Sequence, residues 1–254
     1  MIFPPGADPL GTAAWNAYLR LNRAYRDPFE LLASRYREAV EHLGEEVSED
    51  PFLGSPDTAL VHHLMGLYLM GPIEFGDEAG LLDRFYEIAS VALRGEAINT
   101  IGQGLDEEVS LGGELVDRLR ALFEQRRAAV QRGSDPSELQ GFAWWFRSPV
   151  FDPAWAFPEL RAVVEAGGSV EPDHVVAERL AMLAPEYALD AISSLALLID
   201  SNTREWFAVG SRDEIRTIVG SALGAGGEAE SQARDVINRL VARGYTEFQD
   251  LLLR

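Results

Sequence analysis

Cysteine and lysine are both absent from the sequence, and all 22 basic residues are arginine. A chain without cysteine forms no disulfide, binds no metal through thiolates and has no cysteine nucleophile. A chain without lysine has no Schiff-base lysine, no lysine general base and no phosphate-loop lysine. These two absences exclude several classes of enzyme before any motif is considered.

Long apolar runs are also missing. No run approaches the roughly 18 residues that a membrane-spanning helix requires. The start of the chain, Met1-Ile-Phe-Pro-Pro-Gly6, has neither the basic region nor the following apolar stretch of a secretory signal. The sequence therefore predicts a cytoplasmic protein that does not enter a membrane.

Positive charge is scarce relative to negative charge. The 22 arginines stand against 41 acidic residues, which gives a formal net charge of −19. Such a surface repels phosphates, so we expect no binding of nucleic acid through a basic face. Acidic surfaces mostly serve solubility, although carboxylates spaced like phosphates can mimic DNA towards a basic partner.

Helix signals occur along the whole chain. Start signals, in which a capping side chain is followed by a residue that can reach back to it, recur at Asp27, Asp135, Ser211 and Thr246. Apolar residues between such signals recur every three or four positions, whereas the alternation typical of strands is nowhere long enough to predict a sheet. Together these patterns predict helices over residues 12–26, 28–43, 57–70, 78–103, 112–132, 136–147, 155–166, 173–184, 186–199, 212–224, 229–243 and 246–252.

One short internal similarity bears on the architecture. Ala188-x-Asp-Ala-Ile-x-x-Leu195 matches Ala233-x-Asp-Val-Ile-x-x-Leu240 at an offset of 45 residues, the length of a two-helix repeat. The sequence therefore predicts an all-α fold of antiparallel helical pairs stacked as a short α-solenoid of the HEAT or armadillo type. An irregular helical bundle is the alternative. We expect one elongated domain over residues 1–254, with a possible subdivision into residues 1–133 and 134–254.

Side chains that could carry catalysis or bind metal form no recognisable pattern. His62 and His63 are adjacent, so on a helix they point about 100° apart and cannot easily share one metal ion. The acidic stretch over residues 45–50 lacks the alternating ligands and central glycine of a calcium loop. The glycines over residues 220–227 follow a helix and are read as its end. We therefore assign no catalytic, cofactor-binding or metal-binding residue, and whether the chain is an enzyme stays open.

The most unusual stretch is residues 142–157, which holds seven aromatic residues in sixteen positions. A helix that ends near Ser148-Pro149 and another that starts after Asp152-Pro153 would need bulky side chains to fill their corner, which favours packing. Aromatic residues are also enriched where proteins bind partners. If the stretch forms a partner surface, we expect Trp145, Phe151 and Trp155 to belong to it.

A family resemblance adds a functional expectation. The run Glu138-Leu-x-x-Phe-x-Trp-Trp-Phe146, followed by Trp155 and the helical pairs after it, resembles the C-terminal helical-repeat regions of large bacterial multidomain proteins. Some of these proteins carry a signalling ATPase or a sirtuin-like effector and act in phage defence. The stretch Trp15-x-x-Tyr-Leu-x-x-Asn22, running into Asp27-Pro-Phe-x-x-Leu32, is similar to the segment that opens such regions. The resemblance implies a sensor or scaffold that binds protein, and it carries over no catalytic residue.

These observations favour a non-catalytic helical-repeat module that binds another protein, as a sensor or scaffold in a bacterial defence or signalling system. Because this sequence has no nucleotide-binding or effector domain, such a module would work beside a separately encoded partner. One alternative is an enzyme that uses carboxylates, histidine and arginine at a site with no sequence signature. A second is an acidic inhibitor or DNA mimic. The identity of the partner and the oligomeric state are not predicted.

Overall fold

The computed structural model describes residues 37–44, 56–70, 81–105, 111–201 and 209–253. Every regular element within these ranges is helical, which confirms the all-α prediction. None of the described helices is both long and apolar enough to cross a membrane. The elements are α3 (Pro56–Met70), α5 (Leu81–Ile88), α6 (Val91–Gln103), α7 (Gly113–Gln131), the 3-10 helix η1 (Pro136–Leu139), α8 (Phe142–Arg147), α9 (Pro153–Glu165), α10 (Asp173–Leu183), α11 (Ala188–Ser201), α13 (Arg212–Ala225), α14 (Gly227–Ala242) and the 3-10 helix η2 (Thr246–Leu253).

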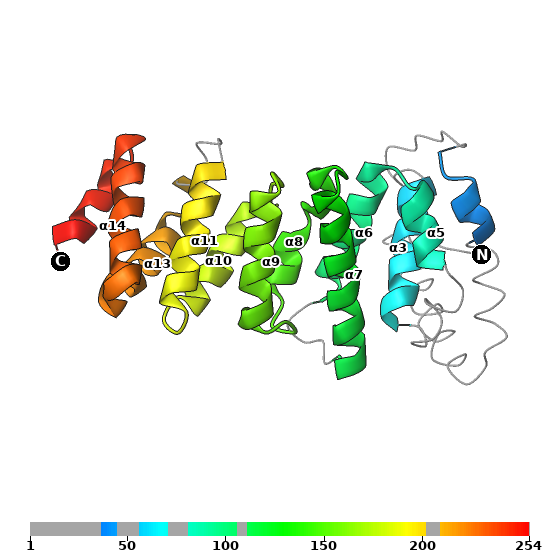
Figure 1. Ribbon diagram of the computed structural model, residues 1–254, viewed down its shortest axis with the longest axis horizontal. Coiled ribbons are helices and arrows are strands. Elements are labelled where there is room, and N and C mark those ends of the chain that lie inside the picture. Colours follow the sequence, from blue (N-terminus) through cyan, green and yellow to red (C-terminus); the bar gives the residue numbers. More distant parts are fainter. Residues whose placement is uncertain (1–36, 45–55, 71–80, 106–110, 202–208, 254) are drawn as a thin grey trace, which may run out of the picture.

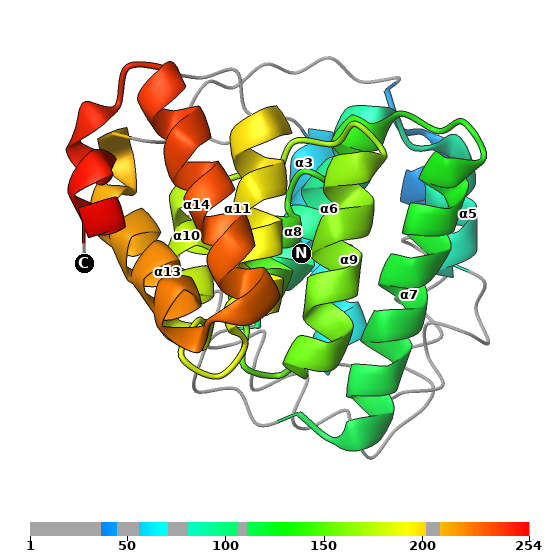
Figure 2. The same cartoon turned by 60° about the vertical axis from the view of Figure 1, so that its left-hand side comes forward.

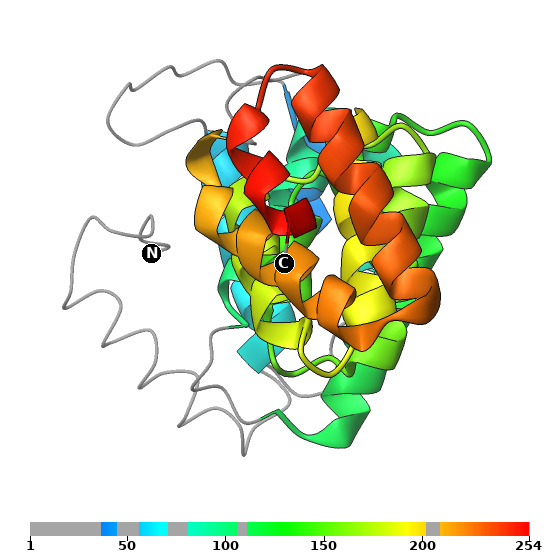
Figure 3. The ribbon, with the colours of Figure 1, turned by 90° about the vertical axis from the view of Figure 1, so that its left-hand side faces the viewer.

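From α6 onwards, successive helices alternate between two layers along the long axis of the molecule (Figure 1). In one layer α6 contacts α8, α8 contacts α10 and α10 contacts α13. In the other, α9 contacts α11 and α11 contacts α14, and α7 lies next to α9 (Figure 2). Contacts between the layers join α8 to α9, α10 to α11 and α13 to α14. The chain therefore advances steadily from one end of the molecule to the other, where α13, α14 and η2 form the C-terminal end (Figure 3).

The buried apolar side chains form one continuous core along this path. It includes Phe85 on α5, Phe123 on α7 and Leu195 on α11, each with no exposed surface. The two copies of the internal similarity contribute equivalent positions, because Ile192 and Ile237 are both fully buried. Their helices, α11 and α14, also contact each other. Apolar periodicity thus identifies the faces that meet in the core.

One predicted helix start is confirmed by its capping bond, because the Ser137 N–H donates to Asp135 Oδ1 over 2.9 Å. The Glu138 side chain, expected to reach back to this cap, instead pairs with two arginines. The helix after Asp152 has a capping bond that no start signal predicted, from the Ala154 N–H to Asp152 Oδ1 over 2.8 Å. The helix predicted after Ser211 begins at the expected residue, but the Ser211 side chain makes no capping bond, so the capping box predicted there is wrong.

Two predicted helices are each interrupted. The helix predicted over residues 78–103 is divided between α5 and α6. Ser90 starts α6 by accepting the Leu93 N–H, and the Ala89 carbonyl accepts from the Arg94 guanidinium over 2.7 Å. The helix predicted over residues 136–147 is η1 followed by α8, with Gly141 as the N-cap residue of α8. Apolar periodicity continues across both breaks, which is why it does not reveal them.

Several predictions lie outside the described residues. The helix over residues 12–26, most of the helix over 28–43 and the acidic stretch over 45–50 belong to this group. Residues 37–43 of the second helix are described, of which 37–41 are helical and 42–43 form a turn, so the helix ends two residues before its predicted end. The subdivision at residue 133 stays a prediction. Ion pairs cross that position, because Glu138 contacts both Arg94 and Arg126.

Candidate functional site

The three aromatic residues proposed as a partner surface lie together, but mainly inside the protein. Trp145 and Phe151 expose 0% and 1% of their surface, and their rings stack with centroids 5.5 Å apart. The Trp145 indole N–H donates to the Ile98 carbonyl over 2.8 Å, which ties α8 to α6. In this conformation neither side chain is available to a partner, because the corner between α8 and α9 is filled by their rings.

Trp155 differs from the other two because it is only partly buried. Its ring centroid lies 4.6 Å from that of Phe151, and its indole N–H donates to Glu124 Oε1 over 2.8 Å. The Arg120 guanidinium lies 5.8 Å from the ring centroid. Trp155 therefore joins α9 to α7 at the edge of the core, and its contact with a partner stays a prediction.

The structure instead directs a different tryptophan towards a hollow surface. Trp144 is partly exposed and lines an open groove of about 740 Å³, whereas the adjacent Trp145 points into the core. On a helix, Phe142, Trp145 and Phe146 follow the three- and four-residue spacing of one apolar face, and Trp144 falls off that face. This spacing was the sequence signal that could have separated the two tryptophans.

The groove runs between α6 and the segment that contains η1 and α8, and we call it the α6–α8 groove. One wall is the outer face of α6, which contributes Val91, Ala92, Gly95, Glu96, Asn99 and Gln103. The other wall and one end come from η1, α8 and the start of α10, which contribute Asp135, Ser137, Gln140, Gly141, Trp144, Glu171 and Pro172. Residues up to 81 positions apart in the sequence thus share one surface.

Glycines bring the two walls close together. A Cβ atom on Gly141 would lie 2.7 Å from the Asn99 Cα, and one on Gly102 would lie 2.7 Å from the Trp144 Cβ. The backbone of Asn99 cannot move aside as a flexible side chain can. Only a glycine at position 141 therefore lets the two walls lie this close together. The Glu171 N–H also donates to the Gln140 carbonyl over 2.9 Å, which fixes the end of the groove against α8.

The groove has carboxylates at three places along its walls. Glu96 Oε1 lies 2.7 Å from His62 Nε2 of α3, which holds that carboxylate in place. Hydrogen bonds from Ser137, first from its backbone N–H, lower the pKa of Asp135, so Asp135 is charged at neutral pH. Glu171 lies at the end formed by the start of α10. Glu96 Oε1 also accepts from the Thr100 hydroxyl over 3.4 Å. Each carboxylate has about four acceptor positions, so two bonds leave capacity for a ligand.

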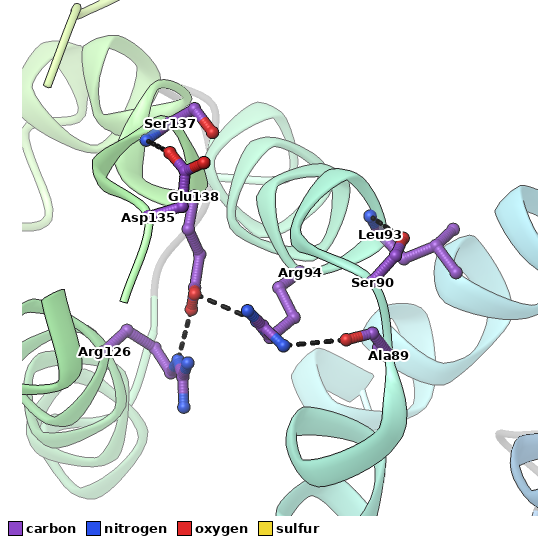
Figure 4. A network of polar contacts seen from close by, with 8 residues as sticks. All are labelled: Ala89, Ser90, Leu93, Arg94, Arg126, Asp135, Ser137 and Glu138. Carbon is purple, nitrogen blue, oxygen red and sulfur yellow. Dashed lines mark hydrogen bonds and ion pairs between the residues drawn. The ribbon is translucent and has the colours of Figure 1, made fainter. Parts of the chain in front are cut away.

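Beneath the groove, a buried ion cluster joins three elements (Figure 4). Glu138 of η1 has no exposed surface and accepts from Arg94 Nε of α6 over 2.9 Å and from Arg126 Nε of α7. The Arg126 guanidinium also lies 4.5 Å from the ring centroid of Tyr86. A carboxylate between two guanidiniums is satisfied only when all three elements are docked, so this cluster fixes the geometry of the walls.

The groove is lined by several kinds of group that can contact a ligand. Amide groups of Asn99, Gln103 and Gln140 offer both donors and acceptors, and Trp144 adds an aromatic surface. Within the described part of the chain, no group of three or more histidine, cysteine or acidic residues is arranged to hold a metal ion. What the groove offers is therefore negative charge, amide hydrogen bonds and one indole.

Comparisons of the chain with protein-family models, with curated proteins and with solved structures found no match.

Proposed function

We propose that the chain is a non-catalytic protein-interaction module, a sensor or a scaffold, built as a short α-solenoid of antiparallel helical pairs. The observation that carries this proposal is the alternation of helices between two layers, in which α6 contacts α8, α8 contacts α10, α9 contacts α11 and α11 contacts α14. Stacked pairs of this kind present elongated surfaces and need no enclosed pocket. Proteins of this architecture commonly act by binding.

The internal similarity supports the repeat interpretation. Its two copies lie on α11 and α14, which are neighbours in one layer. Positions that correspond in the two copies are buried in the same way, as with Leu195 and Leu240. Equivalent residues at equivalent places are expected when one structural unit is repeated and stacked.

The α6–α8 groove supports a binding role. It is an open groove lined by α6, η1, α8 and the segment before α10. Its walls are held by the Glu138 ion cluster and by the close approach at Gly141, so the surface is formed before a partner arrives. Pre-formed surfaces bind with a smaller entropic cost than surfaces that must be ordered. The resemblance to bacterial helical-repeat regions agrees with this role and would place the partner in a signalling or defence system.

The proposal is tested with the whole chain immobilised and a peptide-display library passed over it. A parallel pull-down from the native host is read by mass spectrometry. A double variant, Trp144→Leu with Gln140→Ala, removes contacts in the groove, and Met182→Ala removes a side chain that is 67% exposed on α10. We expect binders that are retained by the unchanged chain and by Met182→Ala and lost by the double variant.

The same experiments can also contradict the interaction role. If neither the library nor the pull-down gives a binder that depends on the groove, and the purified protein carries a tightly bound small molecule, the interaction role is wrong. An enzyme or a small-molecule receptor would then be the better interpretation.

A further inference from the structure

We infer, resting on the interaction role proposed above, that the α6–α8 groove binds an extended basic peptide segment of a partner protein. An arginine of that segment would lie on Trp144, and its main chain would bond to the amides of the groove. The inference depends on four properties of the groove: its length, its charge, its amides and its tryptophan.

The length of the groove suits a short extended peptide. Its α6 wall extends from Val91 to Gln103, which corresponds to about 18 Å of helix. An extended chain rises about 3.3 Å per residue, so about five residues fit along this wall. A helix fits the groove less well. When a volume of about 740 Å³ is spread along this length, the groove is narrower than a helix with its side chains, whose diameter is about 10 Å.

The charge of the groove is of one sign. Glu96, Asp135 and Glu171 line it, and no arginine is among its lining residues. Arg94, on the same helix as Glu96, bonds to the buried Glu138 and to the Ala89 carbonyl (Figure 4). An incoming cation would use acceptor positions of the carboxylates beside the bonds that they already make. The net charge of −19 would also speed the approach of a basic partner.

The amides favour a peptide over other cations. Asn99, Gln103 and Gln140 lie on both walls, and each carries two N–H donors and a carbonyl acceptor. A peptide bond also offers one donor and one acceptor, so it can satisfy such a side chain in both directions. A polyamine has donors but no carbonyl, and the phosphates of a nucleic acid would be repelled by the three carboxylates.

Trp144 is placed to contact an arginine side chain. Its indole is partly exposed in the groove, and the Arg147 guanidinium of the same helix lies 5.9 Å from its ring centroid. Guanidinium groups are attracted to the face of an indole within about 6 Å. The ring thus already receives one arginine from the chain itself, and its groove side can receive another.

The test measures binding of a fluorescein-labelled peptide, (Ser-Arg)3, to the whole chain by fluorescence anisotropy at physiological salt. The acidic peptide (Ser-Glu)3 is measured in the same way, and spermine and unlabelled (Ser-Arg)3 serve as competitors. The groove variants are Trp144→Leu and Glu96→Gln. The matched control is Glu178→Gln, which removes the same charge from an exposed position of α10 outside the groove. Circular dichroism of each variant checks that it is folded.

We expect saturable binding of the basic peptide only. Trp144→Leu and Glu96→Gln should each weaken it about three- to tenfold, because each loses one desolvated contact with a cation. Glu178→Gln should stay within about twofold, since a distant exposed charge is screened by salt. Three results would overturn the inference: equal weakening by Glu178→Gln, equal binding of the acidic peptide, or displacement by spermine at the concentration at which the unlabelled peptide acts.

Failure of this inference can be told apart from failure of the proposed function. If the display library gives groove-dependent binders that contain no arginine or lysine, the interaction role stands and the basic peptide is wrong. If no binder depends on the groove and the purified protein carries a tightly bound small molecule, both are wrong.

Discussion

The α6–α8 groove and the C-terminal pair α13–α14 are held together by different kinds of contact. Around the groove, a fully buried carboxylate, Glu138, lies between Arg94 and Arg126. In α13 and α14 the buried side chains are aliphatic, and charged pairs such as Arg234 with Glu230 lie on the surface. Directed polar bonds fix one placement of the elements they join, whereas apolar packing accepts changes that conserve volume. Of the two regions, the one that contains the groove therefore has the more strictly fixed placement of its helices.

The largest expected effect comes from breaking the buried cluster. Glu138→Ala leaves two mostly buried guanidiniums without their carboxylate, so we expect a loss of about 3–5 kcal/mol in the free energy of unfolding. Chemical denaturation measures this loss. The control is Glu230→Ala, which breaks an exposed pair within α14 and should cost about 0.5 kcal/mol or less. Similar losses for the two variants would contradict the contrast between the regions.

Replacing a glycine by alanine should change the free energy of unfolding by a smaller amount, with opposite signs in the two regions. Gly141→Ala places a methyl group against the backbone of Asn99, and we expect a loss of about 1–3 kcal/mol. Gly220→Ala adds a methyl group to an exposed position inside α13 with nothing within 4 Å, and we expect a gain of about 0.4–1 kcal/mol. Thermal denaturation of both variants gives the signs. A neutral Gly141→Ala would show that the walls of the groove are not fixed by this contact.

The C-terminal region should respond mildly and evenly to conservative change. Ile192 and Ile237 occupy matching positions of α11 and α14 and are both fully buried. We expect Ile192→Val and Ile237→Val each to cost about 0.5–1.5 kcal/mol in urea denaturation. Equal costs would strengthen the repeat interpretation, and costs that differ by more than this range would speak against equivalent positions.

The smallest effect is a dependence of stability on pH, with opposite signs at two carboxylates. Burial raises the pKa of Glu159 although Arg127 opposes this. Its folded-state pKa is then above the unfolded one, so its contribution is present at low pH and lost as pH rises through the folded pKa. A hydrogen bond from Arg84 lowers the pKa of Glu41, so its contribution is present above the unfolded pKa and lost as pH falls.

Urea denaturation between pH 4 and 7 tests these signs. The stability of the unchanged chain relative to Glu159→Gln should fall as pH rises, and its stability relative to Glu41→Gln should rise. The same sign for both variants would show that net charge, and not the local surroundings of each carboxylate, sets the pH dependence.

Local patterns in the sequence account for much of the fold. The carboxylate at Asp135 predicts a helix start because a cap is a contact between residues two or three positions apart. Apolar spacing predicts the buried faces of α11 and α14 for the same local reason. The interruption at Ser90 is not predicted, because the apolar pattern runs through it and the bond from Arg94 to the Ala89 carbonyl stabilises the break only in the folded protein.

The groove could not be predicted from such patterns. Its walls bring Glu96 and Asn99 next to Gln140 and Glu171, and only the docking of η1 and α8 on α6 creates that surface. The aromatic stretch was the one local signal. It lies in a segment that lines the groove, but it directed attention to Trp145, whose ring is in the core, instead of its neighbour Trp144.

The order of contacts along the chain has a further consequence for local unfolding. Helix α8 contacts α6 on one side and α10 on the other, whereas α14 contacts α11, α13 and η2 near the end of the chain. Opening α8 therefore breaks interfaces with α6, α9 and α10 at the same time. Amide hydrogens of α6 and α8 should therefore exchange with solvent mainly through global unfolding. A surface formed between two such helices stays intact while other parts of the protein open locally.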